Sequence, residues 1–333
     1  MNKISYFTRL LGNLYEYQRK RVHCSFLPTG IFLEPTNICN LECVMCPNKE
    51  LPESKKGSMN FSVFKKVIDE ASSFAVHINL FLTGEPLLHP EILGMISYIK
   101  SHGLMVKIHT NGTLLTKNLS EKLITSEADI LSISFDGYNA DTYNSIRKKS
   151  DFQKTLEKVK GFLEIKKSLN SNKPFTIIQT LMMDEKEFSS DNREKFKKIF
   201  DGLPVNRFSA ISPIRWPGQD MDIPGAPARN VSRKFHPCID PWFTMNVLWN
   251  GDVVPCCGDF SGAYVMGNVA DRPLRNIWNN DRMVSLRENL TGAKPLSVNL
   301  CKNCDRLFEE RVLGFPIRNL KYFIKERLPY VKV

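Results

Sequence analysis

Short apolar stretches alternate with longer amphipathic stretches over the first two thirds of the chain. The apolar stretches, such as HINLFL at 77–82, have the length of buried strands. The longer stretches repeat their apolar residues at helical spacing, as Phe64, Val67, Ile68 and Ala71 do. Repeated strand–helix units predict a parallel sheet covered by helices, which is an α/β fold. The predicted strands cover residues 31–33, 77–82, 105–109, 130–135, 175–181 and 207–211, and the predicted helices cover 60–74, 90–102, 117–125, 152–169 and 191–200.

The character of the sequence changes after residue 211. Residues 212–237 are rich in Pro and Gly and have no period, which predicts a long loop. The next segment carries five cysteines, and Asn250-Gly251 between two apolar runs predicts a β-hairpin. The expected organisation is an N-terminal extension at 1–30, the alternating unit at 31–211, the loop at 212–237, a cysteine-rich unit at 238–305 and a basic amphipathic helix at 306–333.

Charge and hydropathy narrow the classes of function. The net charge of +11 over 333 residues suits an anionic ligand, a membrane surface or a nucleic acid. The sequence has no zinc-finger helix, helix-turn-helix pattern or single-strand-binding aromatic motif, so we expect no nucleic-acid partner. No apolar run approaches the ~20 residues of a membrane span, and no secretory signal is visible. We therefore expect a cytoplasmic protein.

Both chain ends have basic amphipathic character. Ile317, Leu320, Ile324 and Leu328 fall on one helical face beside Lys and Arg residues, and Ile4, Phe7, Leu11 and Leu14 do the same. Such a helix lies on an anionic membrane in some proteins and packs on its own domain in more of them. The sequence allows peripheral membrane contact and leaves both alternatives open.

Nine cysteines give the strongest chemical signal, and three of them form the pattern CxxxCxxC at Cys39, Cys43 and Cys46. An odd number of cysteines in a cytoplasmic chain points to metal binding or catalysis rather than to disulfides. Three thiolates are one too few for a closed zinc site or a cubane held by four cysteines, so one iron would stay open to a ligand. The alternatives are a zinc loop completed by a distant residue, or unrelated buried thiols.

The CxxxCxxC loop follows the first predicted strand and precedes a strand–helix series, and in this it resembles the radical SAM superfamily. The resemblance implies a partial (β/α)6 barrel of TIM type over residues 31–211. It also implies a [4Fe–4S] cluster on the three cysteines, with S-adenosylmethionine (SAM) on the fourth iron. One electron from that cluster would cleave SAM to a 5′-deoxyadenosyl radical, which abstracts hydrogen from the substrate. The protein would mainly bind, orient and shield these cofactors.

Several further motifs carry the same resemblance. Leu82-Thr83-Gly84-Glu85-Pro86 is similar to the family's GGE-type motif, with Thr83 in place of its first glycine. The glycine would let the backbone approach the SAM ammonium, from which the following glutamate accepts. A downstream arginine would pair with the SAM carboxylate, the alternative being a solvated helix charge. The resemblance assigns SAM contacts to Met45 (beneath the adenine), Gly84, Glu85, Pro86, Asn111, Ser134, Asp136 and Arg147.

The second group of cysteines resembles the twitch domain, a shortened SPASM domain. Gly267–Asn280 (GNVADRPLRNIWNN) is similar to the SPASM stretch that ends in IWN. The resemblance implies one auxiliary [4Fe–4S] cluster, and the alternative is a Cys₄ zinc ribbon. Cys257 is left over, either as a packing residue, an alternative ligand or a hydrogen donor, and Cys24 is expected only to pack. The expected auxiliary ligands are Cys238, Cys256, Cys301 and Cys304.

Together these features predict a radical SAM enzyme with an external electron donor such as flavodoxin or ferredoxin. Relatives of this layout include dehydrogenases and epimerases of aminocyclitols and sugars. Only about 30 residues precede the first strand, too few for a peptide-recognition domain, which favours a small or carrier-linked polar substrate. Arg215 and Trp216 are candidate substrate contacts, or alternatively anchors of the loop.

Four outcomes remain open at this point. We favour oxidation through the auxiliary cluster, as in a dehydrogenase. An epimerase that uses Cys257 as hydrogen donor is the first alternative, and a peptide-modifying maturase is the second. The third is a non-enzymatic iron–sulfur electron carrier or redox sensor. An open iron argues against a simple carrier, because carriers usually have every iron ligated.

Overall fold

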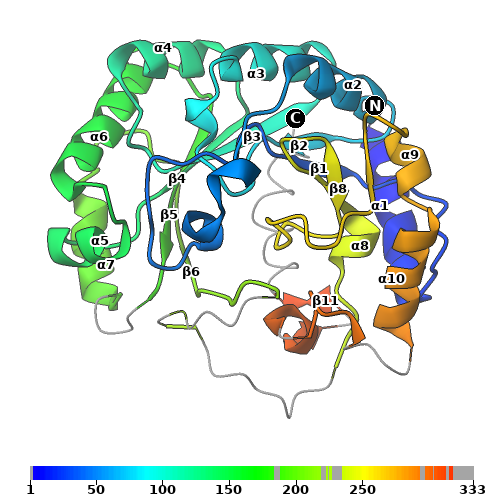
Figure 1. The fold of residues 1–333 in the computed structure, drawn as a ribbon. Coiled ribbons are helices and arrows are strands. Elements are labelled where there is room, and N and C mark those ends of the chain that lie inside the picture. The colour runs from blue at the N-terminus through cyan, green and yellow to red at the C-terminus, as the bar shows by residue number, and fades with distance from the viewer. Residues whose placement is uncertain are drawn as a thin grey trace.

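One nine-stranded β-sheet with helices packed around it forms the framework of the computed structural model (Figure 1). The structure describes residues 3–183, 188–218, 223, 225–226, 235–292, 297–302, 304–312 and 315–317. The strands are β1 (Gly30–Leu33), β2 (His77–Asn79), β3 (Met105–Thr110), β4 (Ile130–Ser134), β5 (Phe175–Leu181), β6 (Arg207–Ile211), β7 (Thr244–Val247), β8 (Asp252–Val254), β9 (Gly267–Asn268) and the separate pair β10 (Arg311–Val312) and β11 (Phe315–Pro316).

The helices cover the outside of the sheet in the order in which they follow the strands. The α-helices are α1 (Lys3–Gln18), α2 (Phe61–Ala71), α3 (Ile92–Ser101), α4 (Lys117–Thr125), α5 (Ala140–Ile146), α6 (Phe152–Ser168), α7 (Ser190–Lys198), α8 (Asp240–Phe243), α9 (Leu274–Ile277) and α10 (Asp281–Thr291). Short 3-10 helices are η1 (Pro47–Glu50), η2 (Glu53–Lys55), η3 (Pro86–Leu88) and η5 (Asp305–Phe308).

Strands β1 to β6 are all parallel and lie in the order β6-β5-β4-β3-β2-β1. Figure 1 shows helices α2, α3, α4, α6 and α7 in an arc outside these strands. The strand-to-helix connections are therefore those of an open (β/α) barrel, and the predicted α/β class with a partial barrel is confirmed.

A row of apolar side chains on one face of the sheet packs toward the helices. In the parallel register Ile31 lies beside Ile78, which lies beside Val106, and all three are buried. Because side chains alternate between the faces of a strand, residues at these positions share one face. They belong to one core with the predicted face of α2, in which Phe64 and Ile68 are fully buried. The apolar residues whose spacing predicted these strands and this helix are therefore the residues that the fold buries.

Two differences from the predicted elements concern the connections. Helix α5 was not predicted, because its sequence, ADTYNSI, has no apolar repeat; it begins where the Asn139 side chain accepts from the Thr142 amide. The strand predicted at 77–82 ends at Asn79. The residues after it leave the sheet to form the loop that carries Gly84.

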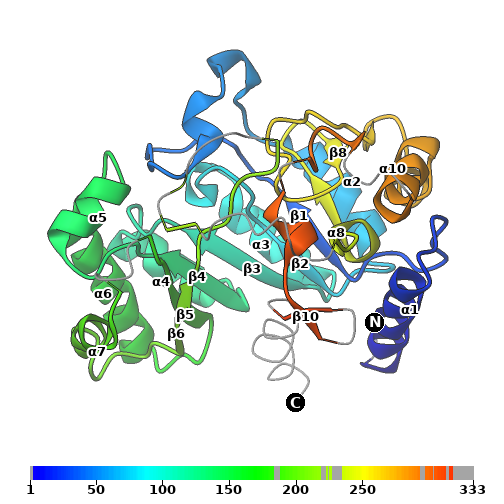
Figure 2. The ribbon, with the colours of Figure 1, turned by 90° about the horizontal axis from the view of Figure 1, so that it is seen from below.

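The cysteine-rich unit continues the barrel sheet and does not form a sheet of its own. Strand β7 pairs in parallel with β1, from Gly30 beside Thr244 to Leu33 beside Val247. Strands β8 and β9 then add in antiparallel fashion, at the opposite end of the molecule from α5–α7 (Figure 2). The predicted hairpin is present, with Gly251 at φ +86° in its turn. The barrel and the cysteine-rich unit, which were predicted as separate domains, are therefore joined by the backbone hydrogen bonds between β1 and β7.

The N-terminal extension packs on the cysteine-rich unit. Helix α1 lies beside α8, where the Asn13 amide donates to the Trp242 carbonyl at 2.7 Å and the Tyr17 hydroxyl donates to the Pro237 carbonyl at 2.9 Å. This leaves Leu11 61% exposed. Cys24 is buried, as expected for a packing residue.

Membrane contact stays a prediction. The helix predicted at 306–333 is wrong over its first part, where Asp305–Phe308 form η5 and β10 pairs with β11. The C-terminal amphipathic face lies outside the described residues, apart from Ile317. Among the residues that the structure describes, no helix has the length and apolar character needed to cross a membrane.

A buried guanidinium joins three segments of this region. Arg287 of α10 donates from Nε to the Pro241 carbonyl at 3.0 Å and from Nη1 to the Val22 carbonyl at 2.9 Å. Its guanidinium carbon lies 4.5 Å from the centre of the Trp278 ring. Two of its acceptors are backbone carbonyls. Removal of the guanidinium would therefore leave these buried carbonyls without a hydrogen bond.

We predict that Arg287→Met lowers the free energy of unfolding by about 3 kcal/mol, because it strands these buried acceptors. Urea unfolding followed by circular dichroism measures the change. The control is Arg272→Met, which removes an exposed arginine from the same region and should change stability by less than about 0.5 kcal/mol. Equal effects of the two substitutions would contradict the prediction.

Candidate functional site

The CxxxCxxC loop leaves the sheet directly after β1 and is held by the segment that follows α5. The Glu42 amide donates to the Lys148 carbonyl at 3.2 Å and the Val44 amide to the Ile146 carbonyl at 3.0 Å. Within the loop, the Leu41 amide lies 3.5 Å from the Cys39 sulfur. These backbone contacts fix the path of the loop, and with it the positions of its thiols.

The three thiols of this loop share one buried environment. Burial raises the pKa of Cys39, Cys43 and Cys46, the last to about 12. The Cys46 thiol also interacts electrostatically with the other two, and Arg147 lowers the pKa of all three. Because metals bind the thiolate, such buried thiols need a cationic partner before they ionise.

Within the described ranges, no three His, Cys, Asp or Glu side chains form a group that could hold a single metal ion. A [4Fe–4S] cluster makes a different demand, because each cysteine binds its own iron. Three neighbouring thiols on one short loop, with a guanidinium close to all of them, fit an anionic cluster of that kind.

Gly84 allows a close approach between two loops. A Cβ at this position would clash with the Thr36 carbonyl oxygen and lie 2.7 Å from that of Ile38. The next amide, of Glu85, donates to the same Ile38 carbonyl at 2.9 Å, one residue before Cys39. The glycine is therefore required by the packing of this loop on the cysteine loop, in addition to any approach to SAM.

The Glu85 carboxylate is buried and joins the same loop to the end of β3. It accepts hydrogen bonds from the Thr110 hydroxyl at 2.8 Å and from the amides of Asn111 at 2.7 Å and Leu87 at 3.1 Å. Burial raises its pKa. Pro86 begins η3, which Glu85 caps. The side chain predicted to bind the SAM ammonium thus has a structural role as well.

Asn111 connects β3 with the cysteine loop. Its side-chain amide donates to the Asn40 side-chain oxygen at 2.9 Å, and Asn40 donates in turn to the Thr113 hydroxyl at 2.8 Å. The predicted residues Glu85 and Asn111 therefore meet the cysteine loop from two directions.

Arg147 is 5% exposed and forms a buried ion pair with Asp136. Its Nε and Nη2 lie 2.9 and 2.5 Å from Asp136 Oδ2, while the Leu181 amide donates to Asp136 Oδ1 at 2.7 Å. Burial by itself would lower the pKa of Arg147, but Asp136 holds it above its usual range. The alternative of a solvated helix charge is therefore wrong. The guanidinium lies within electrostatic range of the three thiols and of Glu85.

Ser134 lies beside the half-buried His109 of β3. His109 Nε2 hydrogen-bonds the Ser134 hydroxyl. Burial, together with the charges of Lys107 and Arg147, lowers the pKa of His109 to about 3, so the imidazole is neutral at pH 7. Both residues face the same side of the sheet.

Met45 and Trp216 link the cysteine loop to the cysteine-rich unit. Met45 packs in a small apolar cluster around Ile146 and Met183, and its carbonyl accepts from Trp216 Nε1 at 2.9 Å. The Trp216 ring meets the Phe260 ring edge-on at 5.7 Å.

Arg215 binds Asp305, with its amide 3.0 Å from Asp305 Oδ2 and its guanidinium 3.3 Å from the same oxygen. These contacts, like those of Trp216, favour the alternative in which the two residues anchor the loop. A substrate role for either stays a prediction.

Glu34 is a fully buried carboxylate at the end of β1 that sequence reasoning missed. It accepts from the Thr83 hydroxyl at 2.6 Å and from the Trp249 amide at 3.2 Å. Thr83 replaces the first glycine of the motif, so its hydroxyl has a partner that a glycine would lack. Burial raises the pKa of Glu34 to about 7.

The five cysteines of the second group lie around one ion pair, Arg306 with Asp240. The backbone amides of Asp240 and Arg306 oppose the effect of burial on the pKa of Cys238 and Cys304 respectively. Burial raises the pKa of the four expected ligands, to about 12 for Cys301 and about 11 for Cys304.

The fifth thiol of this group is also held. The sulfur of Cys257 accepts from Arg306 Nη2 at 3.4 Å.

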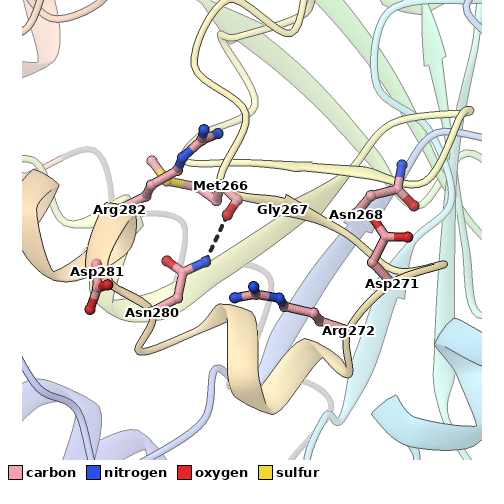
Figure 3. A pocket seen from close by; sticks show the side chains of 8 residues that line it. All are labelled: Met266, Gly267, Asn268, Asp271, Arg272, Asn280, Asp281 and Arg282. Atoms are coloured by element: carbon pink, nitrogen blue, oxygen red, sulfur yellow. Dashed lines mark hydrogen bonds between the residues drawn. The ribbon is translucent and has the colours of Figure 1, made fainter.

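A cavity of ≈340 Å³ lies beside α10, in the Gly267–Asn280 stretch (Figure 3). Figure 3 shows the Asn280 side chain donating to the Met266 carbonyl, at 2.7 Å. Asn280 also caps α10 by accepting from the Met283 amide. These two hydrogen bonds give the stretch a structural role. None of the predicted site residues lines the cavity. It is lined by Met266, Gly267, Asn268, Asp271, Arg272, Asn280, Asp281 and Arg282.

Comparison with known families agrees with these two groups of cysteines. Residues 33–183 match the radical SAM superfamily, and residues 238–305 match SPASM, an iron–sulfur cluster-binding domain. The chain belongs to the radical SAM superfamily. These domains bring with them a SAM-binding [4Fe–4S] cluster, SAM and an auxiliary iron–sulfur cluster. The family and its cofactors were predicted correctly.

Curated relatives of this radical SAM protein differ in activity. It is 26% identical over 298 residues to a tungsten-containing aldehyde ferredoxin oxidoreductase cofactor-modifying protein of Pyrococcus furiosus, covering 77% of this chain and 82% of that one. It is 25% identical over 282 residues to a SAM-dependent 2-deoxy-scyllo-inosamine dehydrogenase of Niallia circulans, covering 83% and 92%. Streptococcus suis SuiB, solved with S-adenosylmethionine, shares the fold with TM-score 0.65 at 16% identity, over 92% of this chain and 78% of that one.

We predict about eight iron per chain after anaerobic reconstitution, from two [4Fe–4S] clusters. Replacing Cys39, Cys43 and Cys46 together with Ala should leave about four, because the second group of thiols is built on other elements. Iron and sulfide analysis measures both, and Cys24→Ala, a buried thiol outside both groups, is the control. About four iron in the intact protein would contradict the second cluster.

We also predict a pH-dependent stability from Glu34. Its pKa of about 7 in the folded protein exceeds the unfolded value of 4.5, so its stabilising share is complete below pH 4.5 and is lost as the pH rises to about 7. The stability of the wild type relative to Glu34→Gln should therefore fall by an amount on the order of 3 kcal/mol across this window.

Urea unfolding at a series of pH values measures this difference. Glu42→Gln, which changes a half-exposed carboxylate in the cysteine loop, is the control for the loss of a carboxylate. A difference between wild type and Glu34→Gln that stays constant with pH would show that Glu34 titrates normally.

Proposed function

We propose that this radical SAM enzyme is an oxidoreductase of the dehydrogenase type that acts on a small or carrier-linked polar substrate. When bound, SAM and the two clusters supply the one-electron chemistry, with hydrogen abstraction at the first site and electron acceptance at the second. The chain's own residues hold these groups, orient the substrate and exclude water. We expect an external one-electron donor such as flavodoxin or ferredoxin.

The observation that carries the proposal is the polar inner face of the sheet. The strand register places Asn79 beside Lys107, His109 beside Ser132, and Ser134 beside Gln179, all on the face opposite to the helices. On this face Ser132 Oγ and Asn246 Oδ1 are buried and have no hydrogen-bond partner among the described residues. This face also carries the apolar residues Phe32, Ile130, Ile177 and Leu181. Its polar residues include Asn79, Lys107, His109, Ser132, Ser134, Gln179, Ser209 and Asn246.

A closed TIM barrel fills its interior with bulky branched side chains. Here the corresponding face carries amides, hydroxyls, an imidazole and a lysine. Buried polar groups are stable only when hydrogen-bonded, so a face of this kind suits a ligand with several hydroxyl or amino groups. The neutral imidazole of His109 either donates or accepts, which suits a hydroxyl.

The dehydrogenase outcome is supported by the second group of thiols and by one relative. The relative from Niallia circulans is a 2-deoxy-scyllo-inosamine dehydrogenase, and the match covers 92% of it. Its substrate is a small polar ring, the class that the inner face suits. At 25% identity the exact substrate does not carry over.

An epimerase would need a hydrogen donor, for which Cys257 is the candidate. Its sulfur accepts a hydrogen bond from Arg306 at 3.4 Å. This contact ties Cys257 to Arg306 and supports a packing role for the thiol over that of a hydrogen donor.

The test is anaerobic turnover of the reconstituted, reduced protein with SAM and a panel of aminocyclitols and amino sugars. A dehydrogenase yields methionine, 5′-deoxyadenosine and a product that has lost two hydrogens, detected by mass spectrometry. Failure to cleave SAM under any condition would support the electron-carrier alternative. A product of unchanged mass with an inverted centre would support the epimerase.

We predict that Cys257→Ala keeps most of the oxidation activity, because Cys257 is expected only to pack and to accept from Arg306. The same turnover assay measures it, with Cys24→Ala as the matched control for loss of a thiol. SAM cleavage without product in the Cys257→Ala protein would restore the hydrogen-donor role. Modification of peptide substrates by the wild type would instead favour a maturase.

A further inference from the structure

We propose that Arg306 is a positioning residue that raises the reduction potential of the auxiliary centre, through its charge and its N–H groups. The proposal deepens the proposed function and rests on it, since it states why this centre accepts an electron. The residue lies in η5, two positions after Cys304.

The backbone and the side chain of Arg306 both reach sulfur atoms. Its Nη2 lies 3.4 Å from the Cys257 sulfur, and its backbone amide interacts electrostatically with the Cys304 thiol. Electrostatic interaction extends to Cys238 as well. One residue therefore touches or influences thiols from three separate segments.

An ion pair fixes the direction of the guanidinium. Arg306 Nη1 donates to Asp240 Oδ2, and Asp240 is itself two residues after Cys238. The two side chains are 18% and 12% exposed, so solvent screens the pair only weakly. Because Nη1 is held by the carboxylate, Nη2 is left to face the sulfur of Cys257.

The third nitrogen of the guanidinium has an N–H group that is free to bind an anion. Arg306 Nε is buried and has no hydrogen-bond partner among the described residues. An unpaired N–H donor of a cation is costly in a protein interior. Beside thiols that would hold an anionic cluster, such a donor gains an acceptor when that cluster is bound.

The consequence for electron transfer follows from charge. Reduction adds a negative charge to the centre, and a nearby positive charge stabilises the reduced form more than the oxidised form. The potential therefore rises, which makes the centre a better acceptor of an electron from a substrate radical. A merely structural ion pair would leave the potential unchanged.

The experiment measures the potential of the auxiliary centre alone. In the protein with Cys39, Cys43 and Cys46 replaced by Ala, a redox titration followed by electron paramagnetic resonance reports this centre without SAM or substrate. We expect Arg306→Gln to shift the midpoint to lower potential while iron stays at about four per chain. The control is Lys302→Gln, which removes an exposed cation between Cys301 and Cys304 and should cause little shift.

A second variant covers the case in which Arg306→Gln does not assemble its cluster. Arg306→Lys keeps the charge but loses the two-pronged geometry, so we expect full iron and a smaller shift in the same direction. An unchanged midpoint in Arg306→Gln with full iron would overturn the proposal. So would an unchanged midpoint in Arg306→Lys when Arg306→Gln loses its iron. Because no substrate is present, a shifted midpoint without dehydrogenase activity would count against the proposed function and not against Arg306.

Discussion

The parallel pairing of β1 with β7 is the contact on which the rest of the molecule depends. The first cysteine loop follows β1, and β7 lies between Cys238 and Cys256, so this one ladder sets the two groups of thiols on a common frame. Parallel strands need long connections, and here nearly the whole barrel lies between the two partners. The site therefore forms only when the chain has completed the barrel and returned to its first strand.

Buried charges recur at each important position around this frame. Arg147 is paired with Asp136, Arg306 with Asp240, and Glu85 accepts three hydrogen bonds. Burial of a charge without a partner is strongly unfavourable, so these pairs define unique positions for the loops that carry them. The same partners leave positive charge near both groups of thiols, which suits anionic clusters.

Much of the fold and part of the site could be predicted from sequence. Apolar periodicity located the strands and the face of α2, and the spacing of the cysteines indicated both cluster loops, because these signals are local. Helix α5 lacks an apolar repeat and was missed. Glu34 and Arg306 were missed because their partners, Thr83 with Trp249 and Asp240 with Cys257, are remote in sequence and no local pattern encodes such contacts.

Trp216 connects the barrel to the cysteine-rich unit. Its indole N–H bonds the carbonyl of Met45, beside Cys46, and its ring rests on Phe260, three residues after Cys257. One aromatic side chain thus acts as a rigid spacer between the CxxxCxxC loop and the loop that follows Cys257. The local separation of these two loops is therefore set by the size of one rigid ring system and does not depend on how many residues the connecting chain contains.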